Sequence, residues 1–218
     1  MTIKSLGEER YNFVCEQFGM NNDNVIKINQ THSANVEIVD KSCKDKFYDN
    51  TDGLVTNDKE IVLPIKVADC ISLILFDPNK MVIANIHSGW RGTVQKIIEI
   101  TIKKMIEEFN CNTYDIICCL CPSIGKCHFE VKKDVKDIFE KAFENMLDRD
   151  IILTSKNLND SYFIDTVLIN RIMLRNLGLK DSNIIESRIC TVCNSNIMHS
   201  YRANRDMAGR NLSIINLK

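Results

Sequence analysis

The stretch that decides the fold is VIANIHSGWRGT, which runs from Val82 to Thr93. Its first half is an uninterrupted apolar run, which is typical of a buried β-strand, and the run stops at His87. Gly89 and Gly92 then flank the only tryptophan and an arginine, so the backbone there can turn sharply or approach a ligand closely. The segment predicts a strand, a tight turn and a helix, and α/β proteins bind their ligands at such strand ends.

Apolar spacing predicts the other elements. Residues 94–109 carry apolar side chains at helical spacing, which predicts one continuous helix. Further helices are predicted after a capping box at residues 5–8, after a capping Asp134, and from Asp165 to a closing Gly178. Strands are predicted at residues 25–28, 36–39, 52–56, 61–67, 71–76, 82–87, 116–120, 151–153, 184–187 and 212–215.

Strands and helices are interspersed along the chain without an internal repeat or a linker. The turn Asp-Pro-Asn-Lys at residues 77–80 would join its two flanking strands into a hairpin, because proline presets φ and Asp and Asn support tight turns. An apolar content of 44% is ample for a core. We therefore predict a single α/β (α+β) domain over residues 1–218.

Composition and charge exclude several classes of partner. The formal net charge is −1 and no basic run is present, so we expect neither nucleic acid nor a membrane surface as a partner. No apolar stretch approaches about 18 residues, the length that indicates a transmembrane helix. The first residues, MTIKSLGEER, lack the apolar core of a signal peptide, so we expect a cytoplasmic protein.

The ten cysteines do not form the pattern of a disulfide framework. In a reducing cytosol we expect most of them to be dispensable thiols. Five are interpreted as small buried hydrophobic residues: Cys15, Cys43, Cys111, Cys118 and Cys119. Cys190 and Cys193 form a single CxxC motif, which is typical of a redox pair or of half a zinc site; without a second CxxC, a structural role is favoured.

His32, Cys70 and His87 each stand where an apolar strand is interrupted. If these strands are neighbours, two imidazoles and a thiolate converge, and a catalytic zinc site uses three such ligands and keeps one position open. The same residues also fit a metal-free hydrolase with Cys70 as nucleophile, His87 as base and His32 or Asp69 as the orienting group. A ligand at a strand end that faces a cleft should contribute little to the core.

Several charged residues are candidates for a role beside this trio. Asp69 precedes Cys70 and is suited to orienting a ligand or acting as general base; the alternative is a turn aspartate that bonds local backbone N–H groups. Arg91, Arg202 and Arg210 are candidates for binding an anion such as phosphate. Arg205 is interpreted as a solvated surface residue.

The chain resembles the YfiH/YlmD family, long labelled polyphenol oxidase or laccase-domain proteins. The most specific motifs are His87-Ser-Gly-Trp-Arg-Gly92 and Ala68-Asp-Cys70. The others, in order, are Gln30-Thr-His32, Thr51-Asp-Gly-Leu-Val-Thr56, Pro122-Ser-Ile-Gly125 with Phe129-Glu-Val131, Cys190-Thr-Val-Cys193, and Ser200-Tyr-Arg202 with Gly209-Arg210. The resemblance extends from about residue 8 to the C-terminus.

This resemblance implies two mixed β-sheets packed between helices, and a zinc ion held by His32, Cys70 and His87. It also implies a purine nucleoside phosphorylase with adenosine deaminase activity, whose substrates are phosphate and adenosine, inosine, guanosine or methylthioadenosine. The family usually carries a further N-terminal segment that helps to line the site, and we expect its absence to affect substrate binding. We expect a monomer.

Departures from the family pattern lie outside the zinc trio. Ser72 replaces the usual proline after Cys70, Cys121 replaces a glycine, His199 replaces an aromatic residue and Ala208 replaces a threonine. Three alternatives to the zinc enzyme are the metal-free cysteine hydrolase, a copper polyphenol oxidase and a non-catalytic relative. Only four histidines are present in the chain, too few for a multicopper set, which disfavours the oxidase.

Overall fold

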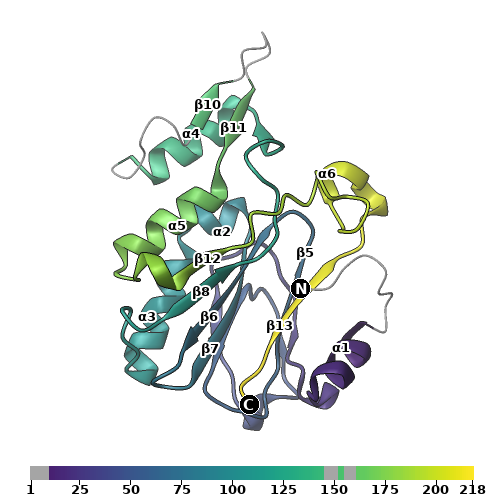
Figure 1. The fold of residues 1–218 in the computed structure, drawn as a ribbon, viewed down its shortest axis with the longest axis vertical. Helices are drawn as coiled ribbons and strands as arrows, with labels where there is room; N and C mark the ends of the chain where they lie inside the picture. Colours follow the sequence, from purple (N-terminus) through teal and green to yellow (C-terminus); the bar gives the residue numbers. More distant parts are fainter. Residues whose placement is uncertain (1–9, 145–151, 155–160) are drawn as a thin grey trace.

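A six-stranded mixed sheet lies at the centre of the molecule (Figure 1). The computed structural model describes residues 10–144, 152–154 and 161–218. The order of the central sheet is β12-β8-β6-β7-β4-β2. Its strands are β2 (Val36–Ile38), β4 (Gly53–Thr56), β6 (Ile71–Asp77), β7 (Val82–Ser88), β8 (Ile117–Leu120) and β12 (Ile184–Glu186). The predicted α/β class is confirmed.

The hairpin predicted around residues 77–80 forms the middle of this sheet. Strands β6 and β7 pair antiparallel, from Asp77 opposite Val82 to Ile71 opposite Ser88. β4 and β8 pair antiparallel with β7 and β6, whereas β2 and β12 add in parallel at the two edges. The strand β7 is buried along its whole length, which explains its continuous apolar run.

Three smaller sheets accompany the central one in the described residues. They comprise β5 (Leu63–Val67) with β13 (Asn211–Ile215), antiparallel; β1 (Lys27–Ile28) with β3 (Phe47–Tyr48), parallel; and β9 (Glu130–Val131), β10 (Ile152–Thr154) and β11 (Tyr162–Ile164), antiparallel. Where two mixed sheets were expected, the described part of the chain forms one mixed sheet and these three small ones.

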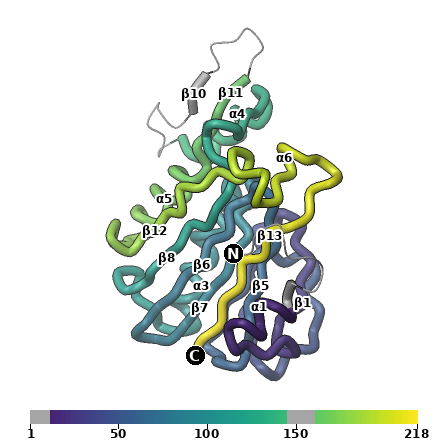
Figure 2. The backbone as a smooth tube through the Cα atoms, turned by 45° about the vertical axis from the view of Figure 1, so that its right-hand side comes forward, coloured from purple at the N-terminus to yellow at the C-terminus, as the bar shows by residue number. Residues whose placement is uncertain are grey.

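The central sheet is covered on both faces. Helices α3 (Ile97–Phe109) and α5 (Thr166–Asn176) lie against one face, and the β5–β13 pair lies on the other (Figures 1 and 2). Neighbouring strand residues face opposite cores: Leu54 and Ile83 belong to the core on the β5 side, whereas Val55 and Ala84 belong to the core on the α3 side. This alternation is the period of two expected of a strand.

The remaining helices are short or peripheral. They are α1 (Arg10–Phe18), α2 (Trp90–Val94), α4 (Lys133–Ala142) and α6 (Tyr201–Asn204), with 3-10 helices at Asn22–Asn24, Lys41–Cys43, Asp181–Asn183 and Arg205–Met207. No helix in the described parts of the chain has the length and apolar character needed to cross a membrane.

The single helix predicted over residues 94–109 is wrong. The chain forms α2, breaks, and begins α3 at Ile97, because Lys96 adopts a left-handed conformation with φ of 59°. A residue in this region cannot continue a right-handed helix. The apolar stripe itself is retained, since Ile97, Ile98 and Ile102 are buried against the sheet.

The predicted helix caps have different outcomes. Asp165 caps α5 by accepting a hydrogen bond from the Leu168 N–H at 2.9 Å, and Gly178 closes the helix with φ of 98°. Asp134 does not cap α4; Lys132 is the capping residue, and Asp134 lies in the first turn, where its charge favours the helix dipole. The capping box at residues 5–8 lies outside the described residues.

Candidate metal centre and its cavity

His87, on β7, is fixed by a buried aspartate. Its Nδ1 lies 2.6 Å from Oδ1 of Asp52, and the two side chains are 4% and 0% exposed. Asp52 immediately precedes β4, the strand beside β7, and its carbonyl also accepts the His87 N–H at 2.7 Å. With Nδ1 engaged in this way, Nε2 is the ring nitrogen left for a further partner.

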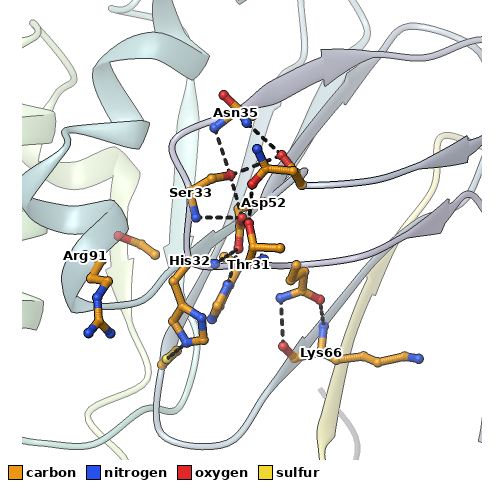
Figure 3. A network of polar contacts seen from close by, with 12 residues as sticks. Thr31, His32, Ser33, Asn35, Asp52, Lys66 and Arg91 are labelled. Atoms are coloured by element: carbon orange, nitrogen blue, oxygen red, sulfur yellow. Dashed lines mark hydrogen bonds and ion pairs between the residues drawn. The ribbon is translucent and has the colours of Figure 1, made fainter.

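The same carboxylate holds the loop that carries His32 (Figure 3). Asp52 accepts hydrogen bonds from the backbone N–H groups of Thr31, His32 and Ser33 at 3.1, 3.0 and 2.8 Å, and from the Ser33 hydroxyl at 2.6 Å. His32 has φ of 63°, a conformation that is uncommon for any residue but glycine. One buried carboxylate therefore positions two of the three predicted ligands.

A second contact ties the His32 loop to β5. The side-chain amide of Gln30 donates to the carbonyl of Lys66 and accepts from its N–H, both at 2.9 Å (Figure 3). This pairing closes the loop against the strand that leads to Cys70. The Gln30-Thr-His32 motif thus has a structural reason: its first residue docks the loop and its last residue faces the site.

The third side chain, Cys70, comes from the turn between β5 and β6. Its Sγ lies 3.8 Å from Nε2 of His32, and the rings of His32 and His87 have centroids 4.7 Å apart. The potential ligand atoms of all three residues lie within 4.8 Å of one another. A thiolate and an imidazole on one tetrahedral metal would be about 3.5 Å apart, so this arrangement fits a metal ion.

Gly89 leaves room for this cluster. A Cβ atom at this position would lie 2.8 Å from Cδ2 of His32 and 3.1 Å from Sγ of Cys70. The Ser88 hydroxyl beside it lies 2.9 Å from the Thr93 hydroxyl and 3.2 Å from the side-chain oxygen of Asn170 on α5. Position 89 therefore requires glycine because the side chains of His32 and Cys70 approach its backbone closely, and not because of a positive φ.

The pKa values of Cys70, His87 and Asp52 are shifted by their neighbours in the site. Burial by itself would raise the pKa of Cys70, but hydrogen bonds with His32 and His87 outweigh it and lower the pKa to about 6. Burial would lower the pKa of His87, but Asp52 and Cys70 raise it to about 9. Burial would raise the pKa of Asp52, yet its bonds from His87 and Ser33 lower it to about 2. We therefore expect Cys70 to be a thiolate at neutral pH.

Asp69, predicted to act beside Cys70, is buried, with φ of 81°. Its Oδ1 accepts the Thr191 hydroxyl and its Oδ2 accepts the Arg202 N–H, both at 2.6 Å. Its carbonyl accepts the Ile124 N–H at 2.8 Å. The partners come from distant segments and not from the local turn, so Asp69 joins three parts of the chain behind Cys70.

The trio lies at a cavity of about 700 Å³. The apolar lining includes Ile28, Val67, Ile71, Trp90, Phe129, Val131 and Tyr201. The cationic lining includes Lys66, Arg202, Arg205 and Arg210. This size and this mixture of apolar walls with a few polar groups are typical of a small-molecule site.

The structure separates the predicted anion-binding arginines. Arg91 is exposed, stacks its guanidinium on the Trp90 ring at 4.3 Å, and is not among the described residues that line the cavity. Arg202 lines it, but its two terminal nitrogens donate to the carbonyls of His128 and Glu130, each at 3.0 Å. Arg210 also lines the cavity, and one of its terminal nitrogens donates to the carbonyls of Ala208 and Gly209. Arg205, predicted to be a solvated surface residue, is exposed and also lines the cavity.

The chain belongs to the family described as multi-copper polyphenol oxidoreductase laccase, which matches residues 5–218. It is 28% identical over 213 residues to "Purine nucleoside phosphorylase YlmD" of Bacillus subtilis, with 94% of this chain and 75% of that protein covered. It is 30% identical over 193 residues to "Adenosine deaminase RL5" of an unknown prokaryotic organism, covering 85% and 72%. A purine nucleoside phosphorylase of Bacteroides thetaiotaomicron is 30% identical over 191 residues, covering 84% and 70%.

Solved structures show the same fold. YfiH of Bacillus licheniformis superimposes with a TM-score of 0.87 at 26% identity, covering 96% of this chain and 80% of that chain. YlmD of Geobacillus stearothermophilus gives a TM-score of 0.87 at 24% identity, covering 95% and 78%. The predicted resemblance to the YfiH/YlmD family and the predicted fold class are thus confirmed.

Proposed function

We propose that this chain is a zinc-dependent purine nucleoside phosphorylase that also deaminates adenosine. The observation that carries the proposal is the convergence of His32, Cys70 and His87 on a cavity of nucleoside size. The names of the relatives, which include both activities, supply the substrate class. Adenosine, inosine, guanosine and methylthioadenosine are the candidate nucleosides, with phosphate as the second substrate.

Two imidazoles and a thiolate are a donor set that zinc accepts, with one coordination position left open. When bound, zinc supplies Lewis-acid chemistry for negative charge that develops on a substrate or on water. Asp52 holds His87 in the tautomer that leaves Nε2 free, and it fixes the loop of His32. The residues of the chain therefore present a preformed metal site to the cavity.

The cavity walls suggest how a nucleoside is held. Trp90, Phe129 and Val67 offer apolar surface for the purine, and the cationic lining offers a place for phosphate. In phosphorolysis a phosphate oxygen bonds to the anomeric carbon of the ribose while the glycosidic C–N bond breaks and its electron pair leaves with the purine. In deamination water replaces the amine of adenosine, and ammonia leaves.

We assign Arg205 and Arg210, rather than Arg202 or Arg91, to phosphate. Arg202 uses both terminal nitrogens on backbone carbonyls, which fits a role in holding the cavity wall, and Arg91 stacks outside it. We also assign Asp69 a positioning role, because both of its carboxylate oxygens already accept short hydrogen bonds. A proton carrier needs an oxygen available to the substrate.

A nucleoside panel tests the proposed function. Purified zinc-loaded protein is expected to release free base and ribose 1-phosphate from nucleosides only when phosphate is present. Adenosine without phosphate is expected to give inosine and ammonia. Absence of turnover with every nucleoside would favour the non-catalytic alternative, and oxygen-dependent phenol oxidation would favour the copper enzyme.

The phosphate assignment makes a separate prediction. Arg210→Gln and Arg205→Gln are each expected to raise the KM for phosphate about tenfold, the loss of roughly one charge-assisted hydrogen bond. Deamination of adenosine, which uses no phosphate, should be unchanged. Arg188→Gln is the control, because this side chain is 83% exposed and lies outside the cavity lining. Equal effects of the cavity substitutions on both reactions would contradict the assignment.

A further inference from the structure

A second cluster of sulfur and nitrogen ligands lies beside the cavity wall. Cys127 and His128 come from the segment after β8, and Cys190 and Cys193 come from the CxxC motif after β12. None of the four is among the described residues that line the cavity, so the proposed nucleoside chemistry does not use them.

The sheet itself brings these two segments together. Strands β8 and β12 run parallel side by side, so the chain leaves both of them at the same edge. The pairing continues past the strands: the Ser123 N–H donates to Ile189 O at 3.2 Å, and the Thr191 N–H donates to Ser123 O at 2.9 Å. Backbone hydrogen bonds therefore set the spacing of the four side chains before any ligand binds.

Tight turns then orient the four side chains toward one another. The N–H groups of His128 and Phe129 donate to Gly125 O at 2.9 and 3.0 Å, and the Asn194 N–H donates to Cys190 O at 3.1 Å. The Gly125 N–H also donates to Sγ of Cys190 at 3.3 Å. Such backbone N–H bonds stabilise a thiolate, the form in which cysteine binds a metal.

Four of the six distances between the ligand atoms fit a tetrahedral metal site. Sγ atoms of Cys127 and Cys193 are 3.8 Å apart. Nδ1 of His128 lies 3.2 Å from Sγ of Cys127, 3.5 Å from Sγ of Cys193 and 3.7 Å from Sγ of Cys190. With zinc bonds of about 2.3 Å to sulfur and about 2.0 Å to nitrogen, two sulfur ligands on a tetrahedral ion would lie about 3.8 Å apart. A sulfur and a nitrogen ligand would lie about 3.5 Å apart.

Hydrogen bonding alone does not account for this arrangement. One imidazole nitrogen makes one hydrogen bond, whereas three sulfurs surround Nδ1 of His128. All four ligand atoms lie within 4.8 Å of one another. A cation at their centre would contact each atom and would offset most of the negative charge of the three thiolates.

We propose that Cys127, His128, Cys190 and Cys193 bind a second zinc ion with a structural role. Four protein ligands fill a tetrahedral shell and leave no position for substrate, which is the mark of a structural site. Three thiolates and an imidazole favour zinc over the hard cations calcium and magnesium. The CxxC motif is then half of a metal site whose other half is an adjacent Cys-His pair.

The ion would brace one wall of the substrate cavity. Phe129 and Glu130 follow His128 directly and line the cavity. On the other segment Thr191 follows Cys190 and donates to Asp69, the residue before Cys70. The second site thus ties the cavity-wall segment after His128 to the segment of Thr191, which supports Asp69 behind the first site.

Metal counting tests the proposal without reference to activity. Wild-type protein purified without added metal is expected to contain two zinc ions per chain by elemental analysis. The double variant C127S/C193S, altered at two exposed positions, should contain one, Cys70→Ser should also contain one, and the combination of all three substitutions should contain none. Cys119→Ser, a thiol on β8 outside both clusters, should keep two.

X-ray absorption at the zinc edge identifies the ligands. The zinc retained by Cys70→Ser is expected to have a first shell of three sulfurs and one nitrogen, whereas the zinc retained by C127S/C193S should have one sulfur. Because these readouts do not depend on turnover, they separate failure of this proposal from failure of the proposed function. If C127S/C193S does not fold, the average number of sulfur ligands per zinc ion in the wild-type protein tests the second site instead.

Two results would overturn the second site. One is a wild-type protein whose zinc content is the same as that of C127S/C193S. The other is a peptide map of freshly purified, non-reduced protein in which Cys127, Cys190 or Cys193 is joined in a disulfide, which would make the cluster a redox pair.

Discussion

Replacement of Cys70 by serine is expected to empty the His32–Cys70–His87 site and to abolish both nucleoside reactions. A hydroxyl is a far poorer zinc ligand than a thiolate. Here the thiolate is strongly favoured, because His32 and His87 lower the pKa of Cys70 to about 6 against the opposing effect of burial. We expect metal affinity at this site to fall by more than about 100-fold, beyond the loss caused by removing an outer partner.

Elemental analysis and rates of phosphorolysis and deamination check this expectation. Cys119→Ser is the matched control, since this partly buried thiol lies on β8 and belongs to neither ligand cluster. Retention of metal in the Cys70→Ser protein, measured with the ligands of the second site also substituted, would contradict the assignment.

Chelation separates the zinc enzyme from the metal-free cysteine hydrolase. Both mechanisms lose activity in Cys70→Ser, so the variant alone does not distinguish them. Metal-stripped wild-type protein is expected to be inactive and to recover with zinc. If Cys70 were the nucleophile and His87 its base, the stripped protein would be the active form, and zinc would inhibit it by occupying the thiolate.

Local signals explain which parts of the fold could be predicted from the sequence. The β6–β7 hairpin and the Asp165 cap of α5 are specified by residues within a few positions of each other. The break at Lys96 has no such signal, because lysine has no preference for the left-handed region. Strands such as β3 and β9 have two residues each and are defined by pairing with distant segments.

The same distinction applies to the candidate site. Each residue of the trio interrupts an apolar run, and this local feature marked them in the sequence. Asp52 was missed, although it lies in a quoted motif, because its role depends on the pairing of β4 beside β7. Cys127 and His128 carry no such local signal, because they are not a second CxxC and meet the first one only through the pairing of β8 with β12.

His87 shows a further limit of reasoning from position along the chain. A cleft-facing ligand at a strand end was expected to contribute little to the core, but His87 is 4% exposed and bonded to a fully buried carboxylate. A role as metal ligand and a role in the buried core are therefore compatible for His87. His87→Ala is expected to lose both metal and stability, so a melting temperature alone would not reveal its role.

Asp52→Asn is expected to produce the largest loss of stability of any single polar substitution near the site. Asp52 accepts five hydrogen bonds, from His87 and from residues 31–33. A side-chain amide carries two N–H groups, so one of its ends would face donors instead of accepting from them. We expect a loss of about 3 kcal/mol in the free energy of unfolding and a 10- to 100-fold loss of metal affinity, each typical of removing such a buried partner.

The pH dependence of the metal-free protein reports on this pair on its acidic side, because above about pH 6 the contribution of Cys70 grows while that of His87 is lost. The pKa of Asp52 is lowered to about 2, so its contribution is present above its unfolded pKa of about 4 and is lost as the pH falls towards 2. The pKa of His87 is raised to about 9, so its contribution is complete below about pH 6.5 and is lost as the pH rises through 9. The pair therefore stabilises the fold most between about pH 4 and 6.5.

Chemical unfolding of the metal-free protein across this pH range provides the measurement. Asp52→Asn should lower the maximum and flatten the acidic limb of the profile, because the carboxylate whose pKa falls on folding is then absent. His87 would still be affected by burial and by Cys70, so the alkaline side does not test the pair. Asp49→Asn is the control, since this carboxylate lies in the same loop but, among the described residues, accepts a hydrogen bond only from the exposed Asn29 side chain, at 2.8 Å. If the variant and the wild type gave parallel profiles, the Asp52–His87 pair would not be the group that couples folding of this site to pH.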